Sequence, residues 1–299
     1  MKESVLKIET VHQCNCCLGC KTLHPLVSVI DLSKASLEQQ TIKFDFYTII
    51  LIEGEVEDFL YGRKYYDYSN ASLVFLTPGE SIKIDKSKPL HHLKGWLLAF
   101  HPDLLHSTSL GDTINNYSYF SYTLDESLHL SLREKTKAIE CLCNIEEELK
   151  HAIDCHSKTL ISRYIELLLD YCSRFYERQF ITRCEANKAL IRKTDMLLDE
   201  YIQSGKLAKS TLPSDEYYAD ILHLSPHYFN DLFKFETGKS LDEYSQFKRL
   251  EVSKKMLLEQ GDTAGMVAEK LGYPNVQYFS RIFKKITGIA PNEYRLAQN

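Results

Sequence analysis

The sequence predicts an α+β protein with a β-barrel in its N-terminal part, helices after the barrel and an all-α C-terminal part built from a repeated unit. Three observations favour this division. Short β-rich runs separated by turn residues fill residues 26–101. From about Leu128 onward, apolar residues recur at helical spacing. Near the C-terminus, one stretch of sequence is repeated after fifty positions.

Length and composition are those of an ordinary globular protein. The 299 residues leave room for two domains with a helical connector, and 44% are apolar and 26% charged. No run of about eighteen apolar residues occurs, and the N-terminus lacks the apolar core of a secretory signal. We therefore expect a cytoplasmic protein that has no membrane partner.

Residues 1–25 form a cysteine-rich N-terminal arm. It holds four of the nine cysteines, with two histidines nearby: Cys14, Cys16, Cys17, Cys20, His12 and His24. The odd cysteine count and the missing export signal argue against a disulfide framework. Thiolates and imidazoles at such spacing can hold zinc, but structural sites draw on two separated pairs of ligands. We expect no metal site, and a reduced arm is the simpler interpretation, with redox sensing as an alternative.

Residues 26–125 form the predicted barrel. Its strands are expected in LVSVIDL, FDFYTIILIEG, SLVFLTPGE, SIKID and LKGWLLAF, with turns at Gly54, Gly62, Pro78-Gly79 and Pro89. The segment YGRKYYDYSNASLVFLTPGE resembles the barrel of cupin-type sensor domains. Barrels of this size can hold one small ligand, so we expect an effector pocket that tyrosines and Trp96 could line.

The histidines of the barrel argue against an enzyme. Metal-dependent cupins usually present two histidines and a carboxylate on adjacent strands. His91 and His92 are consecutive, so on a strand they point to opposite faces, and His101 precedes Pro102 at a strand end. We expect no catalytic residue, no bound metal and no cofactor.

Residues 126–192 are predicted to be a helical connector. Leu128–His151 is charged and amphipathic, and Thr159–Phe180 carries an apolar stripe. The two helices can cap the barrel or pair with a second chain, and we favour a homodimer because a second copy raises the effective concentration at a shared site. The polar stretch 181–192 joins this region to the C-terminal domain, 193–299, which opens with a helix over Thr194–Gln203.

The repeat aligns paired landmarks in the two copies. Tyr228-Phe229, Phe233-Lys234, Thr237-Gly238 and Glu243-Tyr244 recur as Tyr278-Phe279, Phe283-Lys284, Thr287-Gly288 and Glu293-Tyr294. A one-residue gap upstream aligns Ala219 and Leu222 with Ala268 and Leu271. Each copy is typical of a helix, a tight turn and a second helix, which is the helix-turn-helix pattern.

The second helix of each copy carries the predicted DNA contacts. These are His227, Asn230, Asp231 and Lys234 in the first copy, and Val276, Gln277, Ser280, Arg281, Lys284 and Lys285 in the second. Arg281 can bond guanine through two acceptors, and Gln277 or Asn230 can pair with adenine. The lysines suit phosphates, whereas Asp231 would repel a phosphate unless it accepts from a cytosine amino group. Phe279, Ile282, Phe283 and Ile286 make the stripe expected to be buried.

The charge is local. The whole chain has a formal charge of -5, but residues 270–299 hold five cations (Lys270, Arg281, Lys284, Lys285, Arg295) and one anion, Glu293. Between the copies, Leu241–Gln260 is expected to be one helix with Leu241, Tyr244, Phe247, Leu250 and Leu257 on a shared face. Such a linker would place the two reading helices about 34 Å apart, one turn of DNA.

Residues 194–299 resemble the DNA-binding domain of the AraC/XylS family of transcriptional regulators. The resemblance is carried by LSPHYFNDLFKFETGKSLDEY and by VAEKLGYPNVQYFSRIFKKITGIAPNEYR. It implies a sequence-specific regulator that binds double-stranded DNA and responds to a small-molecule effector in the N-terminal barrel, with RNA polymerase as a candidate partner. The alternative is a regulator that senses metal or redox state through the N-terminal cysteines.

Overall fold

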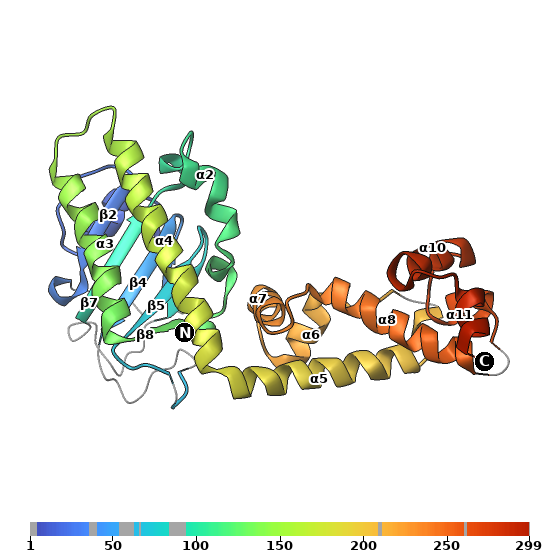
Figure 1. The fold of residues 1–299 in the computed structure, drawn as a ribbon. Coiled ribbons are helices and arrows are strands. Elements are labelled where there is room, and N and C mark those ends of the chain that lie inside the picture. Colours follow the sequence, from blue (N-terminus) through green and yellow to red (C-terminus); the bar gives the residue numbers. More distant parts are fainter. Residues whose placement is uncertain are drawn as a thin grey trace. The chain divides into compact units, whose positions relative to one another are not determined.

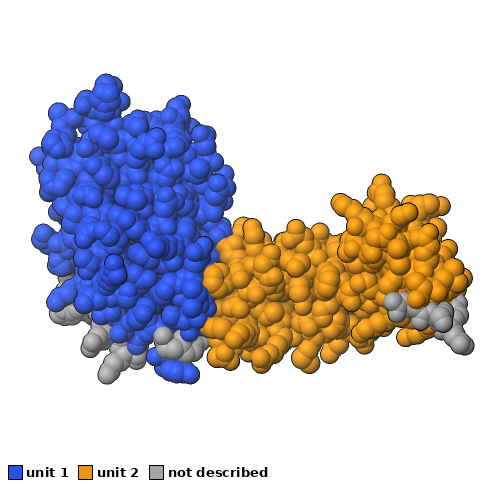
Figure 2. Space-filling model, viewed as in Figure 1, with its two compact units in different colours: residues 1–183 blue, residues 184–299 orange. Residues whose placement is uncertain are grey.

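A computed structural model describes residues 5–35, 41–53, 63–65, 67–83, 94–208, 211–259 and 262–298 (Figure 1). The chain divides into two compact units, residues 1–183 and 184–299 (Figure 2). No helix within the described ranges is long and apolar enough to cross a membrane.

A five-stranded antiparallel sheet forms the centre of the first unit. Its strand order is β2 (Val27–Asp31), β7 (Lys94–Phe100), β4 (Tyr47–Glu53), β5 (Ala71–Leu76) and β8 (Leu128–Leu130). In β5 every residue is buried, and in β4 all but the two ends are. Strands covered on both faces tend to have continuous apolar sequences, which explains the run TIILI in β4.

The two faces of this sheet pack against different layers. Ile49, Leu51 and Phe75 face α3 (Leu132–Lys150) and α4 (Ser157–Thr182), which lie across one side of the sheet (Figure 1). Ile50 and Val74 belong to the opposite core. That core is closed by α1 (Val11–Cys17) and by a three-stranded sheet in the order β1 (Val5–Ile8), β3 (Thr41–Phe44) and β6 (Ser81–Lys83).

The α+β class is confirmed, but the predicted barrel differs in detail. Within the described residues the strands form two separate sheets and not one closed barrel. The predicted strand FDFYTIILIEG is divided at Asp45 and Phe46 between β3 and β4, where the Asp45 N–H donates to the Ile8 carbonyl at 3.0 Å. The expected turns at Gly54, Gly62 and Pro89 lie outside the described residues, as do His91 and His92.

Two short segments fold differently from the prediction. The cysteine-rich arm contains β1 and α1, and Thr10 begins α1 through reciprocal hydrogen bonds with Gln13. That Thr-x-x-Gln spacing is a helix-start signal that could have identified α1. Leu128 belongs to β8 and not to a helix; α3 begins at Leu132, after Ser131 and Glu134 make the same capping arrangement.

The segment between β7 and β8 is a series of short helical turns. They are the 3₁₀ helices η3 (Pro102–Leu104), η4 (Ile114–Asn116), η5 (Ser118–Ser121) and η6 (Leu124–Glu126), with the α-helix α2 (Ser109–Thr113). His101 caps η3, since its Nδ1 accepts the Asp103 N–H at 3.2 Å. This histidine therefore has a structural contact at the end of β7.

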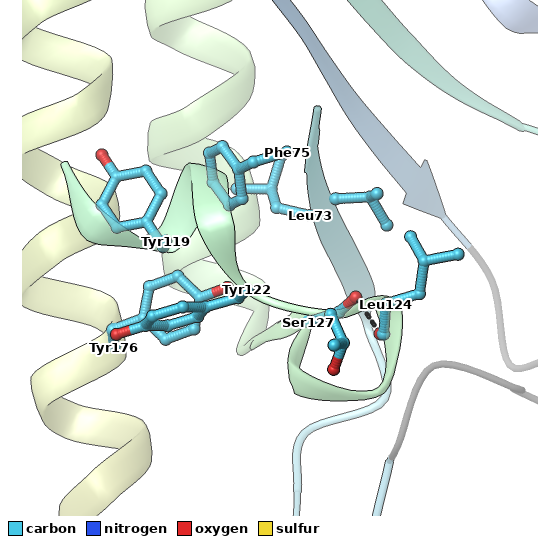
Figure 3. A pocket seen from close by; sticks show the side chains of 9 residues that line it. Leu73, Phe75, Tyr119, Tyr122, Leu124, Ser127 and Tyr176 are labelled. Carbon is cyan, nitrogen blue, oxygen red and sulfur yellow. Dashed lines mark hydrogen bonds between the residues drawn. The ribbon is translucent and has the colours of Figure 1, made fainter. Parts of the chain in front are cut away.

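A small cavity lies between β5, the η5–η6 segment and α4 (Figure 3). Phe75, Tyr119, Tyr122, Ser127 and Tyr176 are among its lining residues. Its volume of about 10 Å³ is close to the least that holds one water molecule. Tyrosines line this cavity, but Trp96 does not, because its ring packs half-buried against the core formed with α3 and α4.

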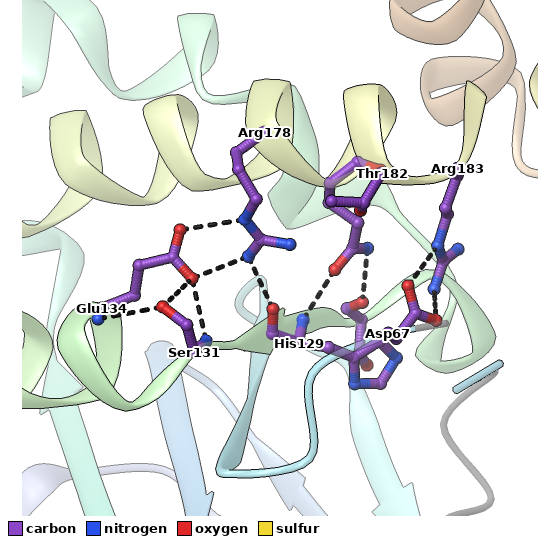
Figure 4. A network of polar contacts seen from close by, with 9 residues as sticks. Asp67, His129, Ser131, Glu134, Arg178, Thr182 and Arg183 are labelled. Atoms are coloured by element: carbon purple, nitrogen blue, oxygen red, sulfur yellow. Dashed lines mark hydrogen bonds and ion pairs between the residues drawn. The ribbon is translucent and has the colours of Figure 1, made fainter. Parts of the chain in front are cut away.

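Side chains at the end of α4 cover the outer edge of β8 (Figure 4). The Gln179 amide accepts the His129 N–H at 2.8 Å and donates to the Ser127 carbonyl at 3.1 Å. Arg178 donates to the His129 carbonyl at 2.7 Å and to Glu134. These contacts satisfy backbone groups that an edge strand would otherwise leave exposed.

Arg183, the residue after α4, forms an ion pair with Asp67 from the segment before β5 (Figure 4). Nε and Nη2 each donate to one carboxylate oxygen, at 2.9 and 2.6 Å. The Asp67 side chain is fully buried and that of Arg183 is 8% exposed. The pair thus joins residues 116 positions apart inside the first unit.

The second unit is helical throughout its described elements. It contains α5 (Cys184–Gln203), η7 (Lys206–Ala208), α6 (Asp215–Leu222), α7 (Pro226–Thr237), α8 (Leu241–Leu258), α9 (Ala264–Lys270), α10 (Val276–Thr287) and α11 (Pro291–Gln298). The helix expected to begin at Thr194 begins ten residues earlier, because α5 starts at Cys184, so most of the polar stretch 181–192 is helical. Its polar residues are used in packing: buried Asn187 donates to Glu236 of α7 at 3.3 Å.

Asp67→Ala should destabilise the first unit by about 3–5 kcal/mol, because it removes the counter-charge of a guanidinium in a buried site. Urea unfolding followed by the fluorescence of Trp96, the single tryptophan and a residue of β7, measures this unit. Glu147→Ala is the control, since it breaks an exposed pair with Lys150 inside the same unit and should leave the free energy of unfolding almost unchanged. Equal effects of the two substitutions would contradict a structural role for the buried pair.

Candidate nucleic-acid interface

The first helix-turn-helix unit consists of α6, a tight turn and α7. The turn contains His223 in the left-handed conformation, with φ at 57°. The Leu224 N–H donates to the Ala219 carbonyl at 2.9 Å and the His223 N–H to the Asp220 carbonyl at 3.2 Å. This pair of bonds is the Schellman ending, which satisfies helix carbonyls and reverses the chain within a few residues.

The second helix-turn-helix unit consists of α9 and α10, and its turn makes the same two backbone hydrogen bonds. The Tyr273 N–H donates to the Ala268 carbonyl at 2.8 Å and the Gly272 N–H to the Glu269 carbonyl at 3.0 Å. Gly272 has φ at 69°, so it corresponds to His223. The offset between the two turns is 49 positions, in agreement with the one-residue gap in the sequence alignment.

The ends of α7 and α10 are also duplicates, now at an offset of fifty positions. Thr237 Oγ1 donates to the Phe233 carbonyl at 2.7 Å, and Thr287 Oγ1 to the Phe283 carbonyl at 2.7 Å. Gly238 and Gly288 follow as left-handed caps. The repeat in the amino-acid sequence is therefore also a repeat of hydrogen bonds.

Aromatic packing repeats in the same way. The rings of Phe233 and Tyr244 meet edge to face at 5.3 Å, and those of Phe283 and Tyr294 at 5.4 Å. Each pair ties the second helix of a unit to the helix that follows it, α8 or α11. The orientation of α7 and α10 is thus set by buried rings on their inner faces.

The outer face of α10 carries the polar residues that the sequence singled out. Gln277, Arg281, Lys284 and Lys285 are exposed, Ser280 and Val276 are half-buried, and Phe279 and Phe283 are fully buried. Val276 packs against the core, so its side chain belongs partly to the fold. Ile286 is 54% exposed and does not continue the buried stripe, because it lies in the last turn before the helix ends at Gly288.

On α7 the four predicted residues divide evenly. His227 and Lys234 are exposed, whereas Asn230 and Asp231 are half-buried. Ser225 caps the helix by accepting the Tyr228 N–H at 3.2 Å, and Asn275 caps α10 by accepting the Tyr278 N–H at 2.7 Å. The first turn of each helix is therefore held in place by its capping side chain.

The charges of the two helices differ. Arg281, Lys284 and Lys285 are the charged residues of α10, whereas α7 combines Lys234 with Asp231 and Glu236. Lys270, counted with the cations of this region, bonds both oxygens of Asp262 at 2.7 and 2.9 Å. It is therefore neutralised by an anion that precedes residue 270, which corrects the local charge count.

Arg281 lies beside an aromatic ring. Its guanidinium carbon is 5.4 Å from the centre of the Tyr278 ring, within the range of a cation–π contact. Tyr278 is 39% exposed, so the pair stands at the surface. The contact restricts the arginine side chain before any ligand is bound.

The linker helix α8 holds both units. Leu241, Leu250 and Leu257 are buried, as predicted for its shared face, but Phe247 is 46% exposed. Lys248 of α8 bonds Asp195 and Asp199 of α5 at 2.6 and 3.2 Å. Phe247 adjoins this polar contact to α5, so the apolar face predicted from spacing is interrupted there.

Arg249 of α8 fixes the second turn. Its Nη2 donates to the Leu271 carbonyl at 2.7 Å, and its guanidinium carbon lies 4.1 Å from the centre of the Tyr273 ring. Arg249 is only 7% exposed, so this cation has a structural position. No local sequence signal identifies this arginine, since its partners are a carbonyl and a ring 22 and 24 positions away.

The N-terminal cysteines do not form a metal centre in the described part of the chain. No group of three or more His, Cys, Asp or Glu residues placed to hold a metal is found there. Cys14 is fully buried in the core beside α1, and burial raises the pKa of its thiol to about 12. A thiol in that environment is a poor metal ligand.

The left-handed turns give opposite expectations for two substitutions. Gly272→Ala should destabilise the protein by about 2–3 kcal/mol, because a Cβ there would lie 2.2 Å from the Leu207 carbonyl oxygen at positive φ. His223→Gly should stabilise it by up to about 1 kcal/mol, since glycine adopts this conformation without strain. Calorimetric unfolding of the full chain measures both.

Gly265→Ala in α9 is the control for these substitutions. Its added Cβ would meet only Thr263 Oγ1 at 3.7 Å, so the variant should gain up to about 1 kcal/mol. Equal losses at residues 265 and 272 would show that α9 tolerates no side chain and that the turn is not the cause.

Comparison with known proteins agrees with this geometry. Residues 218–297 match a family described as a helix-turn-helix domain. The HTH-type transcriptional regulator YobQ of Bacillus subtilis (strain 168) is 40% identical over 95 residues, 32% of this chain and 38% of that protein. The arabinose operon regulatory protein of Escherichia coli (strain K12) is 32% identical over 136 residues, 44% of this chain and 45% of that protein.

A third relative extends into the N-terminal unit. The probable transcriptional regulator LumQ of Photobacterium leiognathi is 24% identical over 230 residues, 75% of this chain and 82% of that protein. The chain spans less than half the length of YobQ and of the arabinose regulator. On the matched segment and its repeated turns, residues 218–297 form a helix-turn-helix domain of the AraC type, similar to those of transcriptional regulators.

Proposed function

We propose that the protein binds specific sequences of double-stranded DNA and regulates transcription. The observation that carries this proposal is the division of α10 into a buried aromatic face and an exposed face with Gln277, Arg281, Lys284 and Lys285. A helix fits the major groove of DNA, where amide and guanidinium groups can distinguish base pairs. The fixed turn before α10 supplies the rigid support that such a contact needs.

The residues of α10 take different roles in this proposal. Arg281 reads guanine through its two-pronged guanidinium, and Gln277 pairs with adenine. Lys284 and Lys285 contact phosphates, and Ser280, four positions before Lys284 and on the same helix face, adds a hydroxyl there. Val276 is the first residue of α10, and the exposed part of its side chain makes an apolar contact with the DNA.

The first unit supplies the weaker reading helix. His227 and Lys234 are exposed, and Asn230 is accessible enough to pair with adenine. Asp231 offsets the charge of Lys234, so α7 lacks the net positive charge of α10. We therefore assign most of the affinity to α10 and a smaller share to α7.

The linker helix supports a two-site arrangement. α8 has 18 residues and is therefore about 27 Å long. With the turns at both of its ends, this length is compatible with reading helices placed roughly 34 Å apart, in successive major grooves. The C-terminal unit, residues 184–299, would then contact two sites on one face of the duplex.

Regulation by a small-molecule effector is the second part of the proposal. The tyrosine-lined cavity beside α4 is the candidate position, but its volume of about 10 Å³ means that Tyr122 or Tyr176 must move to admit more than a water molecule. The DNA affinity of the full chain, measured with and without candidate ligands, tests this part. A response that survives filling the cavity with one methyl group, by Ser127→Thr, would place the effector elsewhere.

A homodimer through α4 is the third part. Leu160, Tyr164, Leu167 and Tyr171 follow one another at steps of four, three and four residues, the spacing of a coiled-coil seam. Leu160 and Leu167 are 41% and 42% exposed. A second copy of this helix would cover the stripe.

The double substitution of Leu160 and Leu167 by serine should convert the dimer to a monomer, because both side chains are exposed in the single chain. Sedimentation velocity at micromolar concentration measures the change. Ile153→Ser, which alters a 60%-exposed side chain before α4, is the control and should leave the dimer intact. A wild-type protein that sediments as a monomer would contradict this part of the proposal.

Arg281→Ala should weaken binding to the specific site by about 1–3 kcal/mol and relax selectivity at one base pair. The reason is the loss of a bidentate base contact, which Arg281→Lys would also remove while it keeps the charge. Selection of bound sequences from a random DNA library, followed by affinity measurements on the selected site, gives both results.

Lys285→Ala serves as the control for a phosphate contact. It should weaken binding to all sequences alike. It should also reduce the slope of log affinity against log salt concentration by about one, because one counterion fewer is released. If Arg281→Ala behaved in the same way as Lys285→Ala, Arg281 would contact only the backbone. An affinity of the wild type that does not change with salt would contradict DNA binding by this surface.

A further inference from the structure

The cysteines of the N-terminal arm differ sharply in environment. Cys14 is fully buried, Cys17 and Cys20 are half-buried, and Cys16 is exposed on α1. Only a thiol that solvent can reach and that can lose its proton reacts readily. Cys16 is therefore the thiol of this group that a reagent in solution reaches most easily.

A histidine faces the Cys16 thiol from the preceding turn of α1. The distance from Cys16 Sγ to His12 Nε2 is 3.6 Å, within hydrogen-bond range for sulfur. Residues four apart on a helix lie on the same face, so α1 itself keeps the two side chains together. A thiol with a base in hydrogen-bond reach is the first requirement of an activated cysteine.

A third residue orients the imidazole. His12 Nδ1 lies 2.9 Å from Thr22 Oγ1, and the Asn15 amide donates to the same oxygen at 3.2 Å. A hydroxyl oxygen accepts two hydrogen bonds, so it can take the Nδ1–H of His12 together with the amide proton. With its proton on Nδ1, the imidazole presents the lone pair of Nε2 to the Cys16 thiol.

The arrangement is anchored in the core of the first unit. Asn15 is fully buried, and its Oδ1 accepts from Ser28 Oγ of β2 at 2.6 Å. Thr22 is thus connected through Asn15 to the central sheet. Cys16, His12 and Thr22 form a supported constellation and not three independent surface residues.

We propose that Cys16 is a covalent modification site that reacts with hydroperoxides, with His12 as the base and Thr22 as the positioning residue. The thiol proton moves to His12 Nε2, and the sulfur attacks one oxygen of hydrogen peroxide. A sulfur–oxygen bond forms and the oxygen–oxygen bond breaks. The leaving oxygen takes the proton from His12, so a thiol and hydrogen peroxide give a sulfenic acid and water.

The chain contains its own comparison thiols. Burial raises the pKa of the Cys14 thiol to about 12, and burial also raises that of Cys20, whose sulfur donates to the Leu18 carbonyl at 3.6 Å. Cys155 is exposed and precedes α4, so it is not part of the arrangement on α1. It therefore reports how an ordinary surface thiol of this protein reacts.

The test treats the full-length protein with hydrogen peroxide at pH 7 and traps sulfenic acid with dimedone. Peptide mass spectrometry then gives the rate at each cysteine. Cys16 should react about 10–100-fold faster than Cys155, and His12→Gln should lower its rate to that of Cys155. Thr22→Val, which keeps the shape of the side chain but removes the acceptor, should lower the rate in the same direction.

Two results would overturn the proposal. One is equal trapping at Cys16 and Cys155 in the wild type. The other is an unchanged rate at Cys16 in His12→Gln whose circular dichroism matches the wild type. Iodoacetamide labelling of the same variants provides a second readout of thiolate reactivity that does not depend on peroxide. Neither measurement uses DNA, so its outcome is independent of the proposed regulatory function.

Discussion

The fold of the C-terminal unit, residues 184–299, depends on the left-handed turn in each of its two helix-turn-helix motifs. At Gly272 and His223 the chain must reverse within one Schellman ending, so that the next helix starts at a fixed angle. That angle decides which side of α10 meets the core. Because Phe279 and Phe283 are buried there, Gln277 and Arg281 are left exposed.

The two copies meet the same constraint with different residues. In the second copy the left-handed position is a glycine, packed so closely against the Leu207 carbonyl that no side chain fits. In the first copy His223 adopts the same conformation at some cost in strain. The copy without strain is also the one with the basic reading helix, whereas α7 carries Asp231 and Glu236 beside Lys234. Both differences support the proposal that α10 makes the principal DNA contacts.

Much of the second unit could be predicted from the sequence because its signals are local. The starts and ends of its helices can be predicted, because the capping residues contact only groups within one helical turn. These residues are Ser225, Asn275, Thr287 and Gly288. Features that depend on distant partners could not be predicted in this way. β1 is a strand because it pairs with β3, β8 because it pairs with β5, and the charge of Lys270 is balanced by Asp262. The exposure of Ile286 and Phe247 likewise depends on what packs nearby, which helical spacing does not contain.

The partners of the cations separate structural charges from those left for a ligand. Arg178 and Arg183 bond carboxylates, and Lys248 does the same in the second unit. Arg249 and Arg295 donate to the Leu271 and Leu257 carbonyls, in positions that packing already fills. Arg281, Lys284 and Lys285 remain exposed, with no ion pair to any described residue. A cation that is already hydrated and unpaired loses little on meeting a phosphate, whereas a buried pair must first be broken. For the proposed DNA binding, the net charge of the chain is therefore a poor guide, and the three cations of α10 without an ion pair are a better one.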